Sequence, residues 1–471
     1  MPLKSILVAD KRRSYGWSSW FCATTDSISC TVQFTLGVLA APVRPTILTW
    51  QRGKQRKVDN LTGTQAAAFS SSSGRHQESW HIALVSAAHF VSHYFIMLLP
   101  PLYVFIRADY DVSYTGLGLA FVAFNVVTAL LQTPAGFLVD RIGARWLLAA
   151  GLALGSASVA VAALVDSFWV FLAMFAVGGL ANTVYHPADY SLLSRRISPE
   201  RLGQAFAIHT FAGMLGGAAA PGSLLLIYAV AGWRGAFLAA AALGFAAAVL
   251  IALSRDLEPV RMPADKPAAS EADGGWRLLL SLPILQNLLF FVLLTVASAG
   301  LQNFSIVALG ELYGTSLGVA NTALSGFLLL TAIGVLAGGV IAGRTTRHSL
   351  LAAFGLIGGA LIAVVIGIWN LGAAFLVLMM SLAGFLQGVI MPSRDLIVRE
   401  STPPGSIGKV FGFVTSGYNI GGIIAPLVFG AMMDNASPRA VFFFVAATSV
   451  AAALAVMTLP KTRASKKFGK A

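Results

Sequence analysis

Apolar residues dominate the chain from Trp80 onwards, in repeated runs of about twenty or more residues separated by short turns. An α-helix rises about 1.5 Å per residue, so each run is long enough to cross the roughly 30 Å hydrocarbon layer of a bilayer. The runs are too long for the strands of a membrane barrel. The pattern therefore predicts an all-α, polytopic membrane protein with twelve transmembrane helices, at residues 80–106, 115–139, 146–165, 168–193, 203–230, 235–253, 279–310, 317–342, 349–369, 371–396, 407–432 and 439–459.

The predicted helices form two halves that repeat in sequence. When residues 203–206 (Gly-Gln-Ala-Phe) are aligned with residues 408–411 (Gly-Lys-Val-Phe), the same shift pairs Thr210 with Thr415, Gly216-Gly217 with Gly421-Gly422, Pro221 with Pro426, Gly179 with Gly384, and Pro187 with Pro392. Parallel repeats of this kind build many twelve-helix transporters, with the substrate near the midplane between the halves. We expect pseudo-symmetric six-helix bundles at residues 80–253 and 279–459, joined by a cytoplasmic linker at 254–278.

Composition and charge placement agree with a membrane protein. Charged residues make up 11% of the chain and apolar residues 57%, whereas soluble domains carry roughly 25% charged residues. Of the 32 Lys and Arg residues, all fall in the tails and in every second loop except Arg107, Arg234, Arg394 and Arg439. This asymmetry predicts cytoplasmic termini in a bacterial inner membrane, and it assigns the net charge of +13 to topology rather than to nucleic acid.

The two ends of the chain carry no predicted span. Residues 1–79 are rich in Ser, Thr, Lys and Arg, and we expect a disordered cytoplasmic tail there, with a basic cytoplasmic tail at 460–471. The apolar patch from Thr31 to Val43 is interrupted by polar residues and ends at a proline. Cys22 and Cys30 form neither a disulfide framework nor a metal-ligand pattern.

A charged turn separates the second and third predicted helices. Two glycines, Gly136 and Gly143, frame Asp140 and Arg141, and Arg145 follows. This turn resembles the signature loop of the major facilitator superfamily of transporters. The resemblance implies that Asp140 faces the start of the eleventh helix and holds the cytoplasmic side shut in one state, with Arg141 and Arg145 adding ion pairs and lipid-surface contacts. A plain charged turn that obeys the topology rule is the alternative.

The fourth and tenth helices end in related sequences of opposite charge. The repeat pairs Asp189 with Arg394 and Arg195 with Glu400. Charges at this depth are costly unless they are paired. We hypothesise that Asp189 and Arg394 form a cytoplasmic gate when the protein opens outward; the alternative is that these are unrelated side chains reaching towards water.

Histidines are the candidate proton carriers. His89 and His93 lie one turn apart in the first helix, His186 precedes a proline in the fourth, and His209 lies in the fifth. Histidine titrates near neutral pH, so these side chains could carry a proton or pair with an anion; a hydrogen-bonded structural role is the alternative for each. No third zinc ligand is evident from the spacing, so we expect no metal site.

Two further stretches narrow the class. Residues 185–189 (Tyr-His-Pro-Ala-Asp) and 198–203 (Ser-Pro-Glu-Arg-Leu-Gly) resemble the fosmidomycin-resistance type of efflux carrier. Residues 213–222, rich in glycine and ending in Pro-Gly, resemble the corresponding stretch of drug–proton antiporters. Both resemblances imply proton-coupled export of a small drug-like or anionic compound. Amides complete the expected cavity, as substrate ligands or as links between helices: Asn125, Asn182, Gln302, Asn303, Gln387 and Asn419.

The sequence thus predicts a secondary carrier, monomeric in the bilayer, that moves a small molecule and protons by alternating access. It shows no nucleotide-binding loop and no nucleophile motif, so we expect neither ATP drive, nor a cofactor, nor an enzyme. Two alternatives remain open: an organic-anion uptake symporter, and a membrane sensor of the same fold that moves nothing.

Overall fold

The computed structural model describes residues 63–257, 275–403 and 406–459, and every regular element in these ranges is a helix. The first half contains α2 (Gly63–Ile96), η1 (Pro100–Leu102), α3 (Tyr103–Tyr110), α4 (Tyr114–Ile142), α5 (Ala144–Leu164), α6 (Phe168–Arg196) and α7 (Pro199–Leu253). After η2 (Arg255–Leu257), the second half contains α8 (Gly275–Leu279), α9 (Leu282–Ala299), η3 (Gly300–Phe304), α10 (Ser305–Tyr313), α11 (Leu317–Ala342), α12 (His348–Ile368), α13 (Ala373–Glu400), α14 (Ile407–Asp434) and α15 (Pro438–Met457). The predicted all-α membrane fold is confirmed.

Eleven helices in these ranges are long and apolar enough to cross a membrane. One of them, α7, has 55 residues and would be about 80 Å long if it were straight, which is far more than one bilayer. Its helical path breaks at Gly232, which has φ 66° and ψ −178°, a conformation that favours glycine. Since α7 therefore holds two spans, the count agrees with the predicted twelve.

The first helix begins earlier than the sequence pattern predicted. Helix α2 starts at Gly63, so residues 63–79 of the expected disordered tail are helical. Extending a helix that has already formed costs little free energy. In addition, the Glu78 carboxylate accepts hydrogen bonds from the Ser198 backbone amide and the Arg201 guanidinium, both at 2.9 Å, which fixes this part of the helix. Residues 1–62, most of the linker (258–274) and the basic tail (460–471) lie outside the described residues.

The sequence repeat corresponds to equivalent packing in the two halves. Helix α6 packs on α4 in the first half, and α13 packs on α11 in the second. At the repeated glycines, a Cβ on Gly179 would collide with the backbone of Phe124, and a Cβ on Gly384 with the backbone of Phe327. Because lipid gives little hydrophobic drive for helix association, such close backbone approach is a main source of packing energy.

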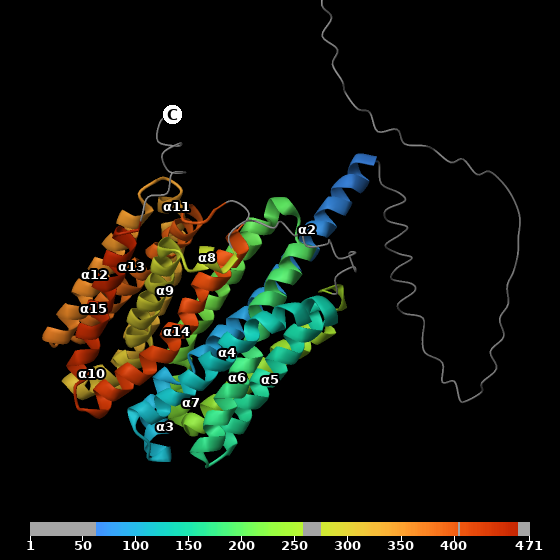
Figure 1. The fold of residues 1–471 in the computed structure, drawn as a ribbon. Helices are drawn as coiled ribbons and strands as arrows, with labels where there is room; N and C mark the ends of the chain where they lie inside the picture. Colours follow the sequence, from blue (N-terminus) through green and yellow to red (C-terminus); the bar gives the residue numbers. More distant parts are fainter. Residues whose placement is uncertain (1–62, 258–274, 404–405, 460–471) are drawn as a thin grey trace, which may run out of the picture. The chain divides into compact units, whose positions relative to one another are not determined.

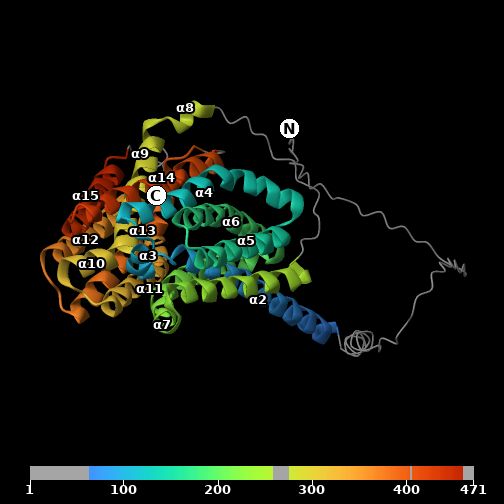
Figure 2. The same cartoon turned by 90° about the horizontal axis from the view of Figure 1, so that it is seen from below.

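The halves meet along two helix pairs, α4 with α14 and α7 with α11, which lie side by side in Figures 1 and 2. We call the end where α4 stops and α14 starts the terminal side, and the other end the distal side. At the distal side, the Asp434 carboxylate of α14 accepts the backbone N–H groups of Tyr114 (2.7 Å) and Thr115 (2.9 Å) at the start of α4. The Tyr114 hydroxyl donates to Glu311 of α10 at 2.9 Å, so the two halves are joined there.

We predict that Gly384→Ala lowers the thermal stability of the purified protein, because the new methyl group must separate α13 from α11. Overpacking of this kind costs about 1–3 kcal/mol. Gly359→Ala in α12 is the matched control, since its Cβ meets nothing within 4 Å. Equal Tm values for the two variants in the same detergent would contradict the close-packing argument.

Candidate functional site: a cavity and a buried histidine–aspartate cluster

A cavity of about 740 Å³ lies between the two halves. Its walls reach Gly136 near the end of α4 and Gly412 near the start of α14, so it extends towards the terminal side. At the distal side, the bonds from the Tyr114 and Thr115 backbone N–H groups of α4 to Asp434 of α14 close the space between the same two helices. The structure therefore has a central chamber with unequal ends.

Most of the predicted substrate residues line this cavity. Residues from both halves contribute: His93, Asn125, Asn182, His186, Gln302, Asn303, Gln387 and Asn419. The Asn125 amide also bridges the halves, since it donates to the Gly422 carbonyl of α14 at 3.4 Å. A Cβ at Gly422 would lie 2.6 Å from the Asn125 side-chain oxygen, so glycine is needed there for this contact.

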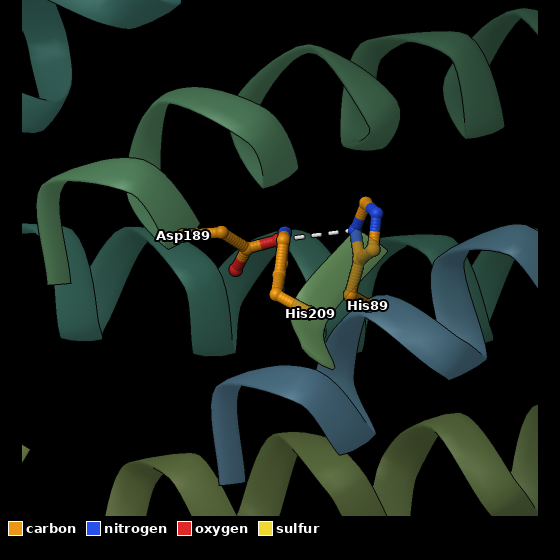
Figure 3. Close-up of side chains that lie close together, drawn as sticks. All are labelled: His89, Asp189 and His209. Carbon is orange, nitrogen blue, oxygen red and sulfur yellow. Dashed lines mark ion pairs between the residues drawn. The ribbon is translucent and has the colours of Figure 1, made fainter. Parts of the chain in front are cut away.

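The remaining two predicted residues, His89 and His209, form a buried cluster with Asp189 (Figure 3). The Asp189 Oδ2 atom lies 3.3 Å from His89 Nδ1 and 3.6 Å from His209 Nε2. The three residues come from α2, α6 and α7, and their exposed fractions are 4%, 0% and 1% for His89, Asp189 and His209. A carboxylate at such a depth needs compensation, and a proton shared with imidazole is the compensation that these neighbours offer.

Two further histidines connect this cluster to the cavity. The His89 ring centroid lies 4.6 Å from that of His93 and 5.2 Å from that of His186, and both of these residues line the cavity wall. His89 also stacks on His209 at 3.9 Å. The imidazoles thus form a continuous series from the chamber to the buried carboxylate.

The ring geometry favours a proton over a shared metal ion. A metal bound by imidazole lies near the plane of the ring, along the nitrogen lone pair. The His89 and His209 planes are only 23° from parallel at a 3.9 Å separation, so they do not meet close to Asp189. The three ligand atoms lie within 4.8 Å of one another, but the planes of the two stacked rings are nearly parallel. The cluster therefore suits proton exchange better than zinc coordination.

Gly213 of α7 makes room for the cluster. A Cβ at this position would lie 2.7 Å from His89 Nε2 and 3.0 Å from His93 Cδ2. The helix pair α2–α7 is also tight one turn further on, where a Cβ at Gly216 would meet the Phe90 carbonyl. The glycine-rich stretch noted in the sequence thus positions the histidines, in addition to packing helices.

The predicted gate residues have different partners in this structure. Asp189 lies with its histidines, whereas the Arg394 guanidinium bonds Asp395 Oδ1 through Nε (2.9 Å) and Nη2 (2.8 Å). Arg394 lines the cavity, and Asp189 does not. Glu400 lies 3.7 Å from His348. The gate pairs Asp189–Arg394 and Arg195–Glu400 stay predictions for a state that is closed at the terminal side.

In the signature loop, Arg145 lies in a different environment from the one predicted. Gly143 adopts φ 105°, which ends α4 and starts α5. Arg145 is buried and donates to the Ala252 carbonyl at the end of α7 at 3.0 Å, so the expected contact of Arg145 with the lipid surface is wrong. The start of α5 is packed inside the bundle, and the last carbonyls of α7 need donors. Arg141 is exposed, and the side chain of Asp140 lies outside the described residues.

Four features of the site escaped the sequence reasoning. Ser298 of α9 accepts amide N–H bonds from Gln302 (2.6 Å) and Gln387 (2.5 Å). Gln302 and Asn303 lie in η3, a π-helical turn, and such turns are frequent at functional sites. Tyr418 lines the cavity beside Arg394, and Asp434 joins the halves. Spacing offered a signal only for Ser298, which lies four residues before Gln302.

A two-bundle membrane fold around a central cavity, with polar side chains from both halves in its walls, is typical of a carrier protein. The profile of the Major Facilitator Superfamily matches residues 85–308 and 288–471, and the chain belongs to this superfamily of transporters. The expectation that it is not an enzyme is therefore confirmed.

The chain is similar to named bacterial transporters. It is 25% identical over 368 residues to the fosmidomycin resistance protein of Escherichia coli (strain K12), covering 77% of this chain and 88% of that one. It is 28% identical over 354 residues to the probable nitrate/nitrite transporter NarK2 of Mycobacterium tuberculosis (strain ATCC 25618 / H37Rv), covering 72% and 85%. The resemblance to the fosmidomycin-resistance type is confirmed.

Solved structures agree on the fold. A bacterial homologue of the human lysosomal transporter Spinster, in an inward-facing and occupied conformation, matches with a TM-score of 0.66 at 15% identity over 81% of this chain and 96% of that chain. The nucleoside transporter NupG matches with a TM-score of 0.63 at 15% identity, over 81% and 100%. At these identities the likeness establishes the architecture alone.

We predict that Gly213→Ala impairs transport and lowers Tm, because the added methyl group must displace His89 from Asp189. The cost of such overpacking is about 1–3 kcal/mol. Gly217→Ala, one turn on in the same helix, is the control, since its Cβ meets only Met97, at 3.6 Å. Transport by the Gly213 variant equal to that of the Gly217 variant would show that the cluster tolerates displacement.

Proposed function

We propose that the chain is a proton-coupled exporter of a small drug-like or anionic compound, working as a monomer in the bacterial inner membrane with both termini in the cytoplasm. The observation that carries the proposal is the fully buried Asp189 between His89 and His209, with His93 and His186 extending from them to the cavity. Intramembrane ionisable groups of this kind mark proton pathways in many carriers.

The orientation follows from charge. Most of the Lys and Arg residues that lie in loops are on the terminal side, which favours the cytoplasm for that side. In that orientation the cavity extends towards the cytoplasm, where an exporter loads its substrate. The similarity to proteins named for fosmidomycin resistance and multidrug resistance supports export, and the similarity to a nitrate/nitrite transporter supports an anionic substrate.

Alternating access gives the cluster its role. In the proposed cycle, the cavity takes up substrate from the cytoplasm, the halves rock about the α4–α14 and α7–α11 contacts, and the substrate leaves on the distal side. A proton then enters from the distal side, passes along the histidines to Asp189, and is released inside. Neutralising Asp189 removes the cost of carrying a bare carboxylate through the change of state.

The net charge moved in each transport cycle distinguishes proton-coupled export from the alternative function, uptake of an anion by symport. One monoanion leaving while one proton enters moves two elementary charges in one direction, and each is worth about 2.3 kcal/mol per 100 mV. Symport of one monoanion with one proton moves no net charge.

The experiment measures flux in proteoliposomes under a potassium diffusion potential. Fosmidomycin, nitrate and L-galactonate are the first probes, because relatives of the chain are named for them. Flux that is accelerated by an inside-negative potential in the export direction supports antiport; flux indifferent to the potential supports symport, and absence of counterflow supports a sensor.

We predict that Asp189→Asn abolishes transport driven by a pH gradient, with at least a tenfold fall in initial rate, while substrate counterflow continues. The amide keeps the shape of the carboxylate but cannot exchange a proton. The titratable groups around it are His89 and His93 on α2, Tyr185, His186 and Tyr190 on α6, and His209 on α7.

The control for this prediction is Asp166→Asn, a carboxylate whose side chain is 96% exposed and which pairs with Arg234 at the distal surface. It should retain the full response to the pH gradient. A gradient-driven rate in the Asp189 variant equal to that of the Asp166 variant would remove Asp189 from the proton pathway.

We predict that Asp434→Ala favours the state that is open at the distal side, because it removes two charge-assisted bonds between the halves at the start of α4. In a protein with Cys22 and Cys30 replaced by serine and a single cysteine at position 302, an impermeant thiol reagent added from the distal side should react several-fold faster. Asn435→Ala is the control, since the Asn435 amide bonds only the Ala431 carbonyl of its own helix. Unchanged labelling would show that these bonds do not hold the distal side closed.

A further inference from the structure

Arg394 differs in charge from the other residues that line the cavity. Within the described part of the chain, the lining contains no Asp, Glu or Lys, and Arg394 is its one arginine. A guanidinium stays charged at any physiological pH, whereas the lining histidines carry charge only when protonated. Arg394 is therefore the one fixed cation in this lining that an anionic ligand could reach.

The surroundings of Arg394 hold this cation at the cavity wall. Its guanidinium carbon lies 4.9 Å from the ring centroid of Phe291 and 5.3 Å from that of Tyr418. Aromatic faces attract a cation without neutralising it. Arg394 is 9% exposed, so its charge acts in a poorly hydrated site, where an anion is attracted more strongly than in water.

Asp395, the ion-pair partner of Arg394, uses only one of its two carboxylate oxygens in this contact. Both Nε and Nη2 bond the same oxygen, Asp395 Oδ1. The strongest arginine–carboxylate geometry uses two oxygens on two parallel N–H groups. The Asp395 side chain is 49% exposed and lies outside the cavity lining, so it can turn to water when another anion arrives.

Acceptor oxygens lie elsewhere in the same cavity. Gln302 and Gln387 both use their amide N–H groups on Ser298, which directs their carbonyl oxygens away from that shared contact. The buried Oδ1 atom of Asn303 has no hydrogen-bond partner. Since a buried acceptor without a donor is costly, this wall fits a ligand that brings O–H or N–H groups.

We propose that Arg394 binds the anionic group of the transported molecule, displacing Asp395, while the amide wall of Gln302, Asn303 and Gln387 binds its hydroxyl or N–H groups. The substrate class is then a small organic anion that also carries hydrogen-bond donors. A cavity of about 740 Å³ is within the usual range for such ligands. This inference rests on the proposed carrier function and assigns its substrate class.

The test measures binding to the full-length purified protein by thermal shift and calorimetry with matched probes. Gluconate and 3-hydroxypropylphosphonate are hydroxylated anions; sorbitol and 1,3-propanediol keep the hydroxyls without the charge; hexanoate and propylphosphonate keep the charge without the hydroxyls. We expect at least one hydroxylated anion to bind at least tenfold more tightly than both of its counterparts. Preference for the neutral probes, or no binding by either hydroxylated anion, would overturn the proposal.

Variants on α13 then locate the site. Arg394→Gln should weaken anion binding at least tenfold, and Arg394→Lys should weaken it less, because charge remains but the planar fork is lost. Arg399→Gln, an exposed arginine on the same helix, is the matched control and should bind as the parent does. Asp395→Asn should tighten binding several-fold by removing the competing carboxylate; weaker binding would mean that Asp395 only holds Arg394 in place.

The gate hypothesis supplies a competing outcome. If Arg394 instead pairs with Asp189, then the exchange Asp189→Arg with Arg394→Asp should restore the transport that either change alone removes, and such rescue would overturn the anion-binding role. The proposed proton coupling fails separately. If anions bind in a way that depends on Arg394 but no flux is driven by a pH gradient, the anion site stands and proton coupling is wrong. If a pH gradient drives the flux of neutral solutes alone, the carrier function stands and the anion site is wrong.

Discussion

A bare charge cannot remain in a hydrocarbon-like interior, and this constraint explains how the few ionised residues of the helical core are placed. Asp189 is enclosed by His89 and His209, and Arg394 lies against the rings of Phe291 and Tyr418 and against Asp395. Each charge is compensated within its own half of the molecule. That arrangement allows the halves to separate on the terminal side without exposing an unpaired ion to lipid, which a carrier requires in both of its states.

The second constraint is close packing, and it serves the site as well as the fold. Glycines at equivalent positions, Gly179 and Gly384, bring α6 and α13 against the backbones of α4 and α11. Elsewhere the same residue type makes space for function: Gly213 accommodates the imidazoles of His89 and His93, and Gly422 accommodates the Asn125 amide at the junction of the halves. A glycine-rich sequence in a membrane helix can therefore serve close helix packing or make room for functional side chains. Which of the two applies depends on the residues of the neighbouring helix.

The sequence predicted the helical spans, their repeat, and most of the amides and both histidines that line the cavity, because hydrophobic run length and polar residues inside such runs are local signals. It paired Asp189 with Arg394 because the repeat relates their positions, whereas the structure places Asp189 of α6 against two other helices of its own half, α2 and α7. That outcome depends on how far α2 and α7 are rotated about their axes, which composition does not encode. The burial of Arg145 and the contacts of Asp434 likewise depend on where a neighbouring helix ends.

The two halves share an architecture but carry different chemistry. The first half holds all the titratable groups of the histidine–aspartate cluster, and the second holds Arg394 and the amides of Gln302 and Gln387 that bond Ser298. If the proposed proton and substrate sites are correct, they lie in different halves and must be coupled through the contacts between the halves. Asn125 is well placed for this role: it lines the cavity, and its amide reaches the Gly422 carbonyl of α14, the helix that also carries Tyr418 beside Arg394. A substrate that draws α14 towards α4 would act on the first half through that contact, and a protonation change in the first half would act on the substrate site by the same route, since coupling between two sites is reciprocal.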